Sequence, residues 1–125
     1  MATQPETNFQ QRVQKLIRSR GGYCKKNWGS MLSAPGVSDI TVCYKGLYIT
    51  LECKVDQNKP SPAQGVHARN VQKAGGLTAV VWTIKEVELI LDIIDELVVH
   101  YKVDTIIDCI KGLMKVAQID DCTRY

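Results

Sequence analysis

Two short strand-like segments on either side of Lys45-Gly46 constrain the fold more than any other part of this 125-residue chain. Residues 39–44 and 47–54 are rich in β-branched, aromatic and aliphatic side chains, a composition that is typical of strands. The glycine between them suits the tight turn of a hairpin. The sequence therefore predicts a β-hairpin over residues 39–54.

The register of this hairpin decides which side chains share a face. With a two-residue loop, Tyr44 pairs with Leu47. Counting back along both segments sets Asp39 directly opposite Glu52, and such side chains share a face with Cβ atoms about 4.5–5.5 Å apart. Alternation adds Lys54 to that face. The opposite face takes the apolar side chains of Ile40, Val42, Tyr44, Leu47, Ile49, Leu51 and Cys53. A slip of one residue would exchange the two faces, so the register is strongly specified.

Two carboxylates at this distance repel each other, and one of them tends to take up a proton unless a cation compensates the charge. A Mg²⁺ or Mn²⁺ ion suits a site formed by Asp39 and Glu52, because hard cations prefer carboxylate and water oxygens. A structural salt bridge between Lys54 and the two acids is the other interpretation. The hairpin alone leaves both interpretations open.

The hairpin is part of a longer series of motifs that spans roughly residues 5–84. The series is Glu6 on a first helix, Gly36-x-x-Asp39, Glu52-x-Lys54, Ser61-Pro62-Ala63-Gln64 at the start of a later helix, and Gly75-Gly76 before the apolar run 77–82. In this order the chain resembles the PD-(D/E)XK nuclease superfamily, and more closely its virus-type replication-repair nuclease (VRR-NUC) domain, which is similar to phage and archaeal Holliday-junction resolvases. Such domains usually carry a proline directly before the aspartate, whereas this chain has Ser38 there and Pro35 upstream.

The resemblance implies an α/β fold with a restriction-endonuclease-like core: a helix, a three-stranded β-meander, a helix and a strand, in a mixed sheet flanked by helices. Two C-terminal helices follow. We expect one domain overall, in which residues 1–84 form the nuclease core and residues 85–125 form a helical extension. The apolar stripe of that extension either packs on the core or forms a homodimer interface, as in junction-resolving relatives.

By the same resemblance, Asp39 and Glu52 are expected to ligate Mg²⁺ (or Mn²⁺). The backbone carbonyl of Cys53 is a further expected ligand. Glu6 would contribute directly or through water, although an acid in the first turn of a helix also suits the helix dipole.

Two more residues complete the catalytic set that the resemblance implies. Lys54 would position the attacking water or stabilise charge on the transition state. Gln64 would orient Lys54 or a bound phosphate, and its alternative is an ordinary exposed glutamine.

The implied activity is that of a Mg²⁺-dependent, structure-selective DNA endonuclease, similar to Holliday-junction resolvases and acting as a homodimer on branched DNA. A flap or nicking nuclease of replication and repair is one alternative, and a non-catalytic DNA-binding accessory protein is another. A small free-standing domain of this type is reminiscent of phage replication or recombination genes.

Charge is unevenly distributed along the chain. Residues 1–80 carry 11 Lys and Arg against 4 Asp and Glu, whereas residues 81–125 carry 5 against 9. We therefore expect the nucleic-acid-binding side in the first part. The candidate DNA contacts are Arg12, Lys15, Arg18, Arg20, Lys25, Lys26, Trp28, Lys59 and Arg69. The basic residues equally suit a solvated helix face, and Trp28 equally suits packing against the sheet.

The spacing of the five cysteines is not that of a zinc site, and their number is odd. Both features favour a reducing compartment. Cys43 and Cys53 are expected as small buried residues. The N-terminus has no signal-peptide pattern and no stretch is long and apolar enough to span a membrane, so we expect an intracellular, cytoplasmic protein.

The remaining elements follow from hydrophobic periodicity and from start and stop residues. We expect a helix from about residue 5 to Gly21-Gly22, a strand at 23–26, a loop at 27–35, a helix from the Ser61 cap to about Ala74, a strand at 77–82 that is buried on both faces, and helices at 86–99 and 103–117.

Overall fold

The structure, a computed structural model, describes residues 4–28, 36–101 and 103–116. The elements are α1 (Gln4–Ser19), β1 (Tyr23–Lys26), β2 (Ile40–Tyr44), β3 (Leu47–Cys53), α2 (Pro62–Lys73), β4 (Leu77–Val81), α3 (Ile84–Tyr101) and α4 (Val103–Val116). Their order is the expected one, and the described bounds differ from the expected bounds by no more than two residues.

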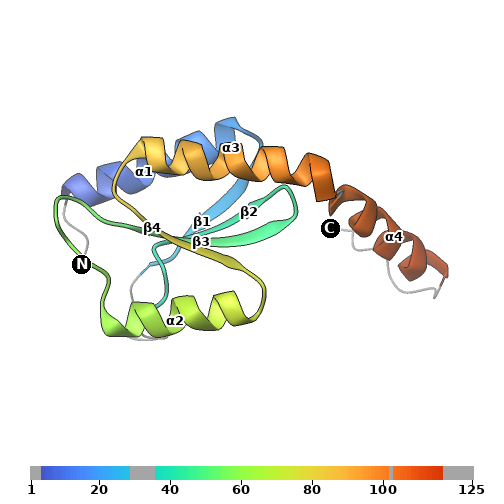
Figure 1. Cartoon of the computed structure of the whole chain (residues 1–125). Coiled ribbons are helices and arrows are strands. Elements are labelled where there is room, and N and C mark those ends of the chain that lie inside the picture. Colours follow the sequence, from blue (N-terminus) through green and yellow to red (C-terminus); the bar gives the residue numbers. More distant parts are fainter. Residues whose placement is uncertain (1–3, 29–35, 102, 117–125) are drawn as a thin grey trace.

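The four strands form one sheet in the order β1-β2-β3-β4. The first three strands are antiparallel neighbours, and β4 pairs in parallel with β3. The connection from β3 to β4 runs through α2, so these three elements form a βαβ unit. Helices α1 and α3 lie on one side of the sheet and α2 lies on the other (Figure 1). The expected mixed sheet flanked by helices is thus confirmed.

The turn between β2 and β3 explains their pairing. Lys45 and Gly46 both have positive φ, 52° and 85°, which is typical of a two-residue type I′ hairpin turn. The observed pairs, from Ile40 with Leu51 to Tyr44 with Leu47, are those of the predicted register.

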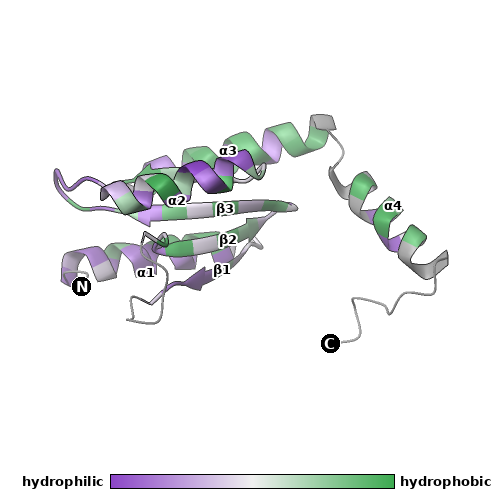
Figure 2. Cartoon of the chain, turned by 90° about the horizontal axis from the view of Figure 1, so that it is seen from below, coloured by the Kyte–Doolittle hydropathy of each residue, from purple (hydrophilic) through white to green (hydrophobic). Residues whose placement is uncertain are grey.

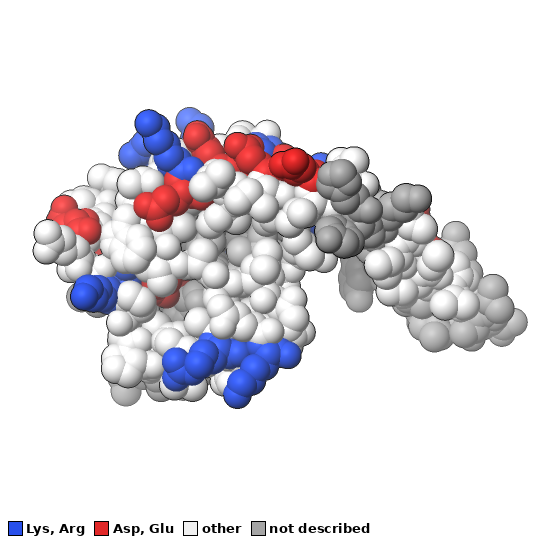
Figure 3. Space-filling model, in the orientation of Figure 1, with Lys and Arg blue, Asp and Glu red and all other residues white. Residues whose placement is uncertain are grey.

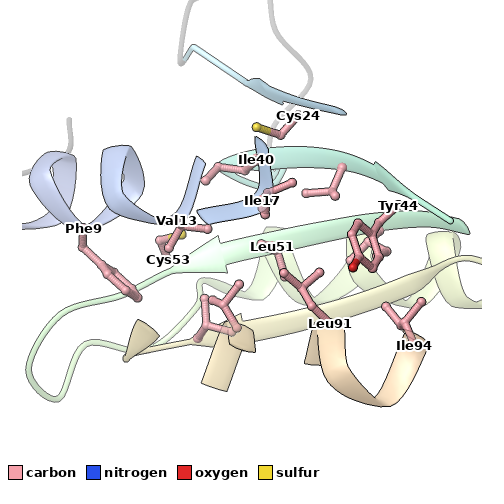
Figure 4. Close-up of a cluster of buried hydrophobic side chains, with 14 residues drawn as sticks. Phe9, Val13, Ile17, Cys24, Ile40, Tyr44, Leu51, Cys53, Leu91 and Ile94 are labelled. Carbon is pink, nitrogen blue, oxygen red and sulfur yellow. The ribbon is translucent and has the colours of Figure 1, made fainter. Parts of the chain in front are cut away.

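The hydrophobic core lies on one side of the sheet, between the strands, α1 and α3 (Figure 4). Its members are Phe9, Val13, Ile17, Cys24, Ile40, Val42, Tyr44, Ile49, Leu51, Cys53, Val81, Val87, Leu91 and Ile94. By contrast, α2 contains no buried residue. The side of the sheet that carries Asp39 and Glu52 is therefore covered only in part, by a helix that adds no buried residue to this core (Figure 2).

Helix α3 contributes Val87, Leu91 and Ile94 to the core, so the core extends beyond residue 84. Helix α4 instead projects away from the layered body (Figure 1). Its side chains Ile106, Ile110 and Leu113 are exposed. A homodimer through this helix stays a prediction.

An ion-pair network joins the end of α1 to α3. One guanidinium nitrogen of Arg20 lies 2.7 Å from a carboxylate oxygen of Asp92 and 2.7 Å from one of Asp95. The other Asp95 oxygen accepts a hydrogen bond of 2.7 Å from the Tyr44 hydroxyl. The Tyr44 bond is the main cause that lowers the pKa of Asp95, and Arg20 adds to it.

Two sequence-based expectations are wrong. The strand at 77–82 was expected to be buried on both faces, but β4 lies at the edge of the sheet and only Val81 in it is buried. Its apolar run reflects partial cover by α2 and α3. Cys43 was expected to be buried, but it is exposed, because it lies on the face opposite the core. Among the described residues, no helix is long and apolar enough to cross a membrane.

The contribution of α3 to the core can be tested with two leucines on that helix. Leu91 is 2 % exposed and Leu89 is 58 % exposed. We expect Leu91→Ala to lower the free energy of unfolding by about 2–5 kcal/mol, because it leaves a cavity in the core. The matched change Leu89→Ala should alter it by no more than about 0.5 kcal/mol. Urea denaturation followed by circular dichroism measures both, and equal effects would contradict this packing.

Candidate metal and catalytic site

The β2–β3 register, continued by one residue, sets Asp39 opposite Glu52 as expected. Two backbone hydrogen bonds hold Asp39 in place. Its carboxylate accepts a bond of 2.8 Å from the amide of Cys53, and its carbonyl accepts one of 2.7 Å from the amide of Asn27. Asp39 is thus fixed between β1 and the end of β3.

Glu52 is the buried acid of the pair, with 4 % of its surface exposed. Its Oε1 accepts a hydrogen bond of 2.6 Å from Gln64 Nε2 and lies 3.3 Å from the Lys54 ammonium. Its Oε2 is buried and makes no hydrogen bond within the described part of the chain. Burial, and then the nearby Asp39 carboxylate, raise the pKa of Glu52 to about 8, against the opposing effect of Lys54.

Gln64 owes its position to the start of α2. Ser61 is the N-cap, and the Ser61 hydroxyl accepts a hydrogen bond of 3.2 Å from the Gln64 amide. In return, Gln64 Oε1 accepts one of 2.7 Å from the Ser61 amide, which completes a capping box. The side-chain NH₂ then remains for Glu52. Gln64 was expected to orient Lys54 or a phosphate, but in the structure it contacts the carboxylate that Lys54 also pairs with.

Gly36 brings the segment before Asp39 against the start of α2. Its φ is +82°, and a Cβ at this position would collide with the backbone of Ala63. Glycine is therefore needed here for both conformation and close approach. The contact explains why the Gly36-x-x-Asp39 motif and the Ser61-Pro62-Ala63-Gln64 motif occur together.

Glu52 does not lie on an open face of the sheet. Helix α2 contacts it through Gln64, and a cavity of about 170 Å³ remains between the helix and the strands. Thr50, Glu52 and Gln64 are among the residues that line it. The hydroxyl of Thr50 is buried and, like Glu52 Oε2, makes no hydrogen bond among the described residues. Sequence patterns did not single out Thr50, whose only signal is that it shares a face with Glu52.

The donor set fits a hard divalent cation. Two carboxylates and the Cys53 carbonyl offer only oxygen ligands, which Mg²⁺ prefers. The unpaired Oε2 of Glu52 is a buried acceptor that a cation would satisfy. Glu6 is buried on α1. Burial raises the pKa of the Cys53 thiol, and the carboxylates of Asp39, Glu52 and Glu6 add to this effect. Within residues 4–28, 36–101 and 103–116, no three acidic, His or Cys side chains form a metal-binding group, and a contribution from Glu6, directly or through water, stays a prediction.

The candidate DNA contacts divide between the two sides of the sheet. Arg12, Lys15 and Arg18 are exposed on α1, which lies opposite α2. Arg20 was a candidate, but it is engaged with Asp92 and Asp95 and serves to join α1 to α3. That pairing was invisible in the sequence because the partners are more than 70 positions apart.

The other candidates lie around β1 and α2. Lys25, Lys59 and Arg69 are exposed. Trp28 is 73 % exposed and does not pack against the sheet, and the Lys26 ammonium lies 4.3 Å from its ring centroid. In this cation–π contact the Trp28 ring interacts with Lys26 of the same chain.

Comparisons with known proteins agree with this geometry. A solved structure described as a VRR_NUC domain superposes with a TM-score of 0.56 and 26 % sequence identity, over 77 % of this chain and 96 % of that one. The structure of Hjc, a Holliday junction resolvase from Archaeoglobus fulgidus, superposes with a TM-score of 0.51 and 16 % identity, over 62 % of this chain and 67 % of that one. No family model and no curated protein sequence matches the chain.

The likeness to Hjc shows the fold, and the likeness to the VRR_NUC domain extends over nearly all of that domain. The resemblance inferred from the motifs is therefore confirmed: this chain has the restriction-endonuclease-like α/β fold and is similar to the PD-(D/E)XK nucleases of the VRR-NUC type.

Proposed function

We propose that this protein is a metal-dependent endonuclease that cuts branched DNA in the manner of a Holliday-junction resolvase. One observation carries the proposal: the carboxylates of Asp39 and Glu52 and the ammonium of Lys54 meet at the end of β3. The similarity to a VRR_NUC domain and to Hjc supports the same activity.

Asp39, Glu52 and the Cys53 carbonyl would hold Mg²⁺ or Mn²⁺. When bound, such an ion polarises a phosphate and lowers the pKa of a coordinated water. Gln64 and Lys54 both engage Oε1 of Glu52, so Oε2 is the oxygen left for the cation. Gln64 thus acts as a positioning residue for Glu52.

Lys54 supplies the positive charge that the reaction needs. Hydrolysis joins a water oxygen to phosphorus and breaks the bond to the 3′ oxygen, which takes up a proton. The products are a 5′-phosphate and a 3′-hydroxyl. In the transition state, negative charge accumulates on the phosphate oxygens, and a fixed ammonium beside them lowers the barrier.

A panel of DNA substrates tests the reaction and its selectivity. Labelled four-way junction, flap, nicked and plain duplex DNA are incubated with the protein and Mg²⁺, with EDTA as the control. We expect branched DNA to be cut in preference to plain duplex. Two symmetric cuts in a junction need two active sites, so light scattering should show a homodimer. If the protein binds these substrates but cuts none of them, a non-catalytic accessory protein is favoured.

The carboxylates are tested by isosteric changes. Asp39→Asn and Glu52→Gln should each lower Mg²⁺-dependent cleavage by at least about 100-fold, because each removes a charged oxygen ligand. Asp56→Asn is the matched control, since Asp56 is an exposed loop acid of the same chain. Quantified cleavage of a labelled flap measures all three, and wild-type rates for both site variants would refute the assignment.

Lys54→Met removes the ammonium and keeps a long side chain. We expect cleavage to fall by about 10²–10³-fold, since the lysine stabilises charge in the transition state. DNA affinity, measured by fluorescence anisotropy in EDTA, should change by much less. A loss of affinity as large as the loss of rate would mean that Lys54 only binds phosphate.

The raised pKa of Glu52 predicts how the stability of the metal-free protein depends on pH. Between about pH 4.5 and 8 the folded state holds a proton that the unfolded state has lost. Stability therefore falls as pH rises through this window. Thermal melts in EDTA should show this slope, Glu52→Gln should flatten it, and Mg²⁺ should raise the melting temperature most at the upper end.

A further inference from the structure

The α2 side of the sheet is only partly covered by its helix. Seen from that side, α2 lies away from β1 and β2, and no described helix crosses in front of these two strands (Figure 2). On the part of this face that no described helix covers, the register aligns Tyr23 with Cys43, and Cys43 with Tyr48. Tyr23 is 68 % exposed, Tyr48 is 51 % exposed, and Cys43 is exposed. We call this line of three residues the tyrosine row.

The tyrosine row shares its face with the candidate catalytic site. Cys43 and Tyr48 are each four residues from Asp39 and Glu52 along the same strands. An even separation keeps side chains on one face, and four residues span about 13 Å of strand. A molecule lying along β2 and β3 would thus reach both the row and the acids.

Tyr48 also lines an open groove of about 590 Å³ beside α2. The opposite wall carries His67, Asn70 and Val71. At the end of the groove is Gly76, where a Cβ would collide with Val71 and press on the Tyr48 ring. The groove thus combines an aromatic surface with imidazole and amide groups, which can hydrogen-bond to the polar edge of a planar ring.

The charge around this face suits a polyanion. Residues 57–76, which contain α2, include Lys59, Arg69 and Lys73 and no acidic residue. Lys25 lies two residues from Tyr23 along β1, on the same face of the sheet. Acidic side chains gather instead over α3, on the other side of the sheet (Figure 3). The tyrosine row therefore lies on a side whose exposed charges near it are basic, whereas the other side combines the acidic surface of α3 with the basic residues of α1.

We propose that the tyrosine row and its groove bind unpaired nucleotides of a DNA strand that leads to the catalytic site. The bases stack on Tyr48 and Tyr23, and the backbone faces Lys25 and α2. A paired base is already stacked between its neighbours in the duplex, so aromatic side chains on a sheet bind the free faces of single-stranded bases. Among the branched substrates of the proposed nuclease, the tyrosine row then favours DNA with a single-stranded segment, such as a flap, over a fully paired four-way junction. This inference names the substrate of that proposed function.

Binding of fluorescein-labelled oligo(dT) in EDTA tests the site without cleavage. Anisotropy titrations should show that Tyr48→Leu weakens binding by about 5- to 100-fold, because stacking of one base is lost. Leucine at position 48 keeps an apolar side chain beside Gly76. Thermal melts of the Tyr48→Leu variant check that it remains folded. Tyr23→Leu should weaken binding in the same direction, and Tyr48→Phe should stay within about twofold of wild type, because the ring remains. Leu89→Ala, on the acidic side, is the matched control.

Photo-crosslinking locates the bound bases. An oligonucleotide with 5-iodouracil is irradiated in complex with the protein, and the attached peptide is identified by mass spectrometry. We expect crosslinks at Tyr48 and Tyr23. Crosslinks confined to α1 or α3, wild-type binding by Tyr48→Leu, or tighter binding of duplex than of oligo(dT) would each overturn the proposal.

The same variants separate this inference from the proposed activity. If Tyr48→Leu binds oligo(dT) as wild type while Mg²⁺-dependent cleavage persists, the tyrosine row is not the binding site and the nuclease stands. If oligo(dT) binding depends on Tyr48 but no DNA is cut, the row stands and the nuclease assignment fails.

Discussion

The pairing of β2 with β3 is the constraint on which the rest of the structure depends. The two-residue turn at Lys45 and Gly46 fixes it, because both residues take the left-handed backbone that a tight hairpin needs. In this register every aliphatic side chain of the hairpin turns toward α1 and α3, and both acids turn the other way. A slip of one residue would place Asp39 and Glu52 in the apolar core, at a cost in desolvation that the core could not offset. Formation of the core therefore also forms the acidic pair.

The second layer of the molecule is held differently from the first. Helix α2 has no buried residue, and its contacts with the sheet include the polar pairs of Gln64 with Glu52 and Gln72 with Thr78. The first of these contacts lies in the candidate site itself. A change in the charge of Glu52 must therefore act on the docking of α2 as well as on the acids, because Gln64 belongs to both. The raised pKa of Glu52 marks this site as one where burial disfavours charge in the absence of a cation.

Much of this architecture was predictable from the sequence, because local signals determined it. The hairpin register followed from alternation and a glycine turn, and the start of α2 followed from Ser61 and Pro62. Long-range pairing was not predictable. The engagement of Arg20 by Asp92 and Asp95 joins residues far apart in the chain, and the edge position of β4 depends on sheet order, which hydrophobicity alone does not encode. For the same reason the sequence predicts that Gln64 orients Lys54 or a bound phosphate and does not predict its hydrogen bond to Glu52, which depends on how closely α2 approaches β3.

The difference between the two sides of the sheet connects stability with function. The side that faces α1 and α3 contains the core. Its outer surface over α3 is acidic and would repel a polyanion. Two of the α3 acids, Asp92 and Asp95, instead form ion pairs with Arg20 of the same chain. The α2 side contributes no buried residue to this core, and it has exposed tyrosines, a groove and unpaired buried acceptors whose desolvation costs stability. The exposed tyrosines lie on the same face of the sheet as the acids. Because the apolar side chains of the sheet are buried on one face, the other face remains for binding. The proposed binding face and the acidic pair then lie on the same strands.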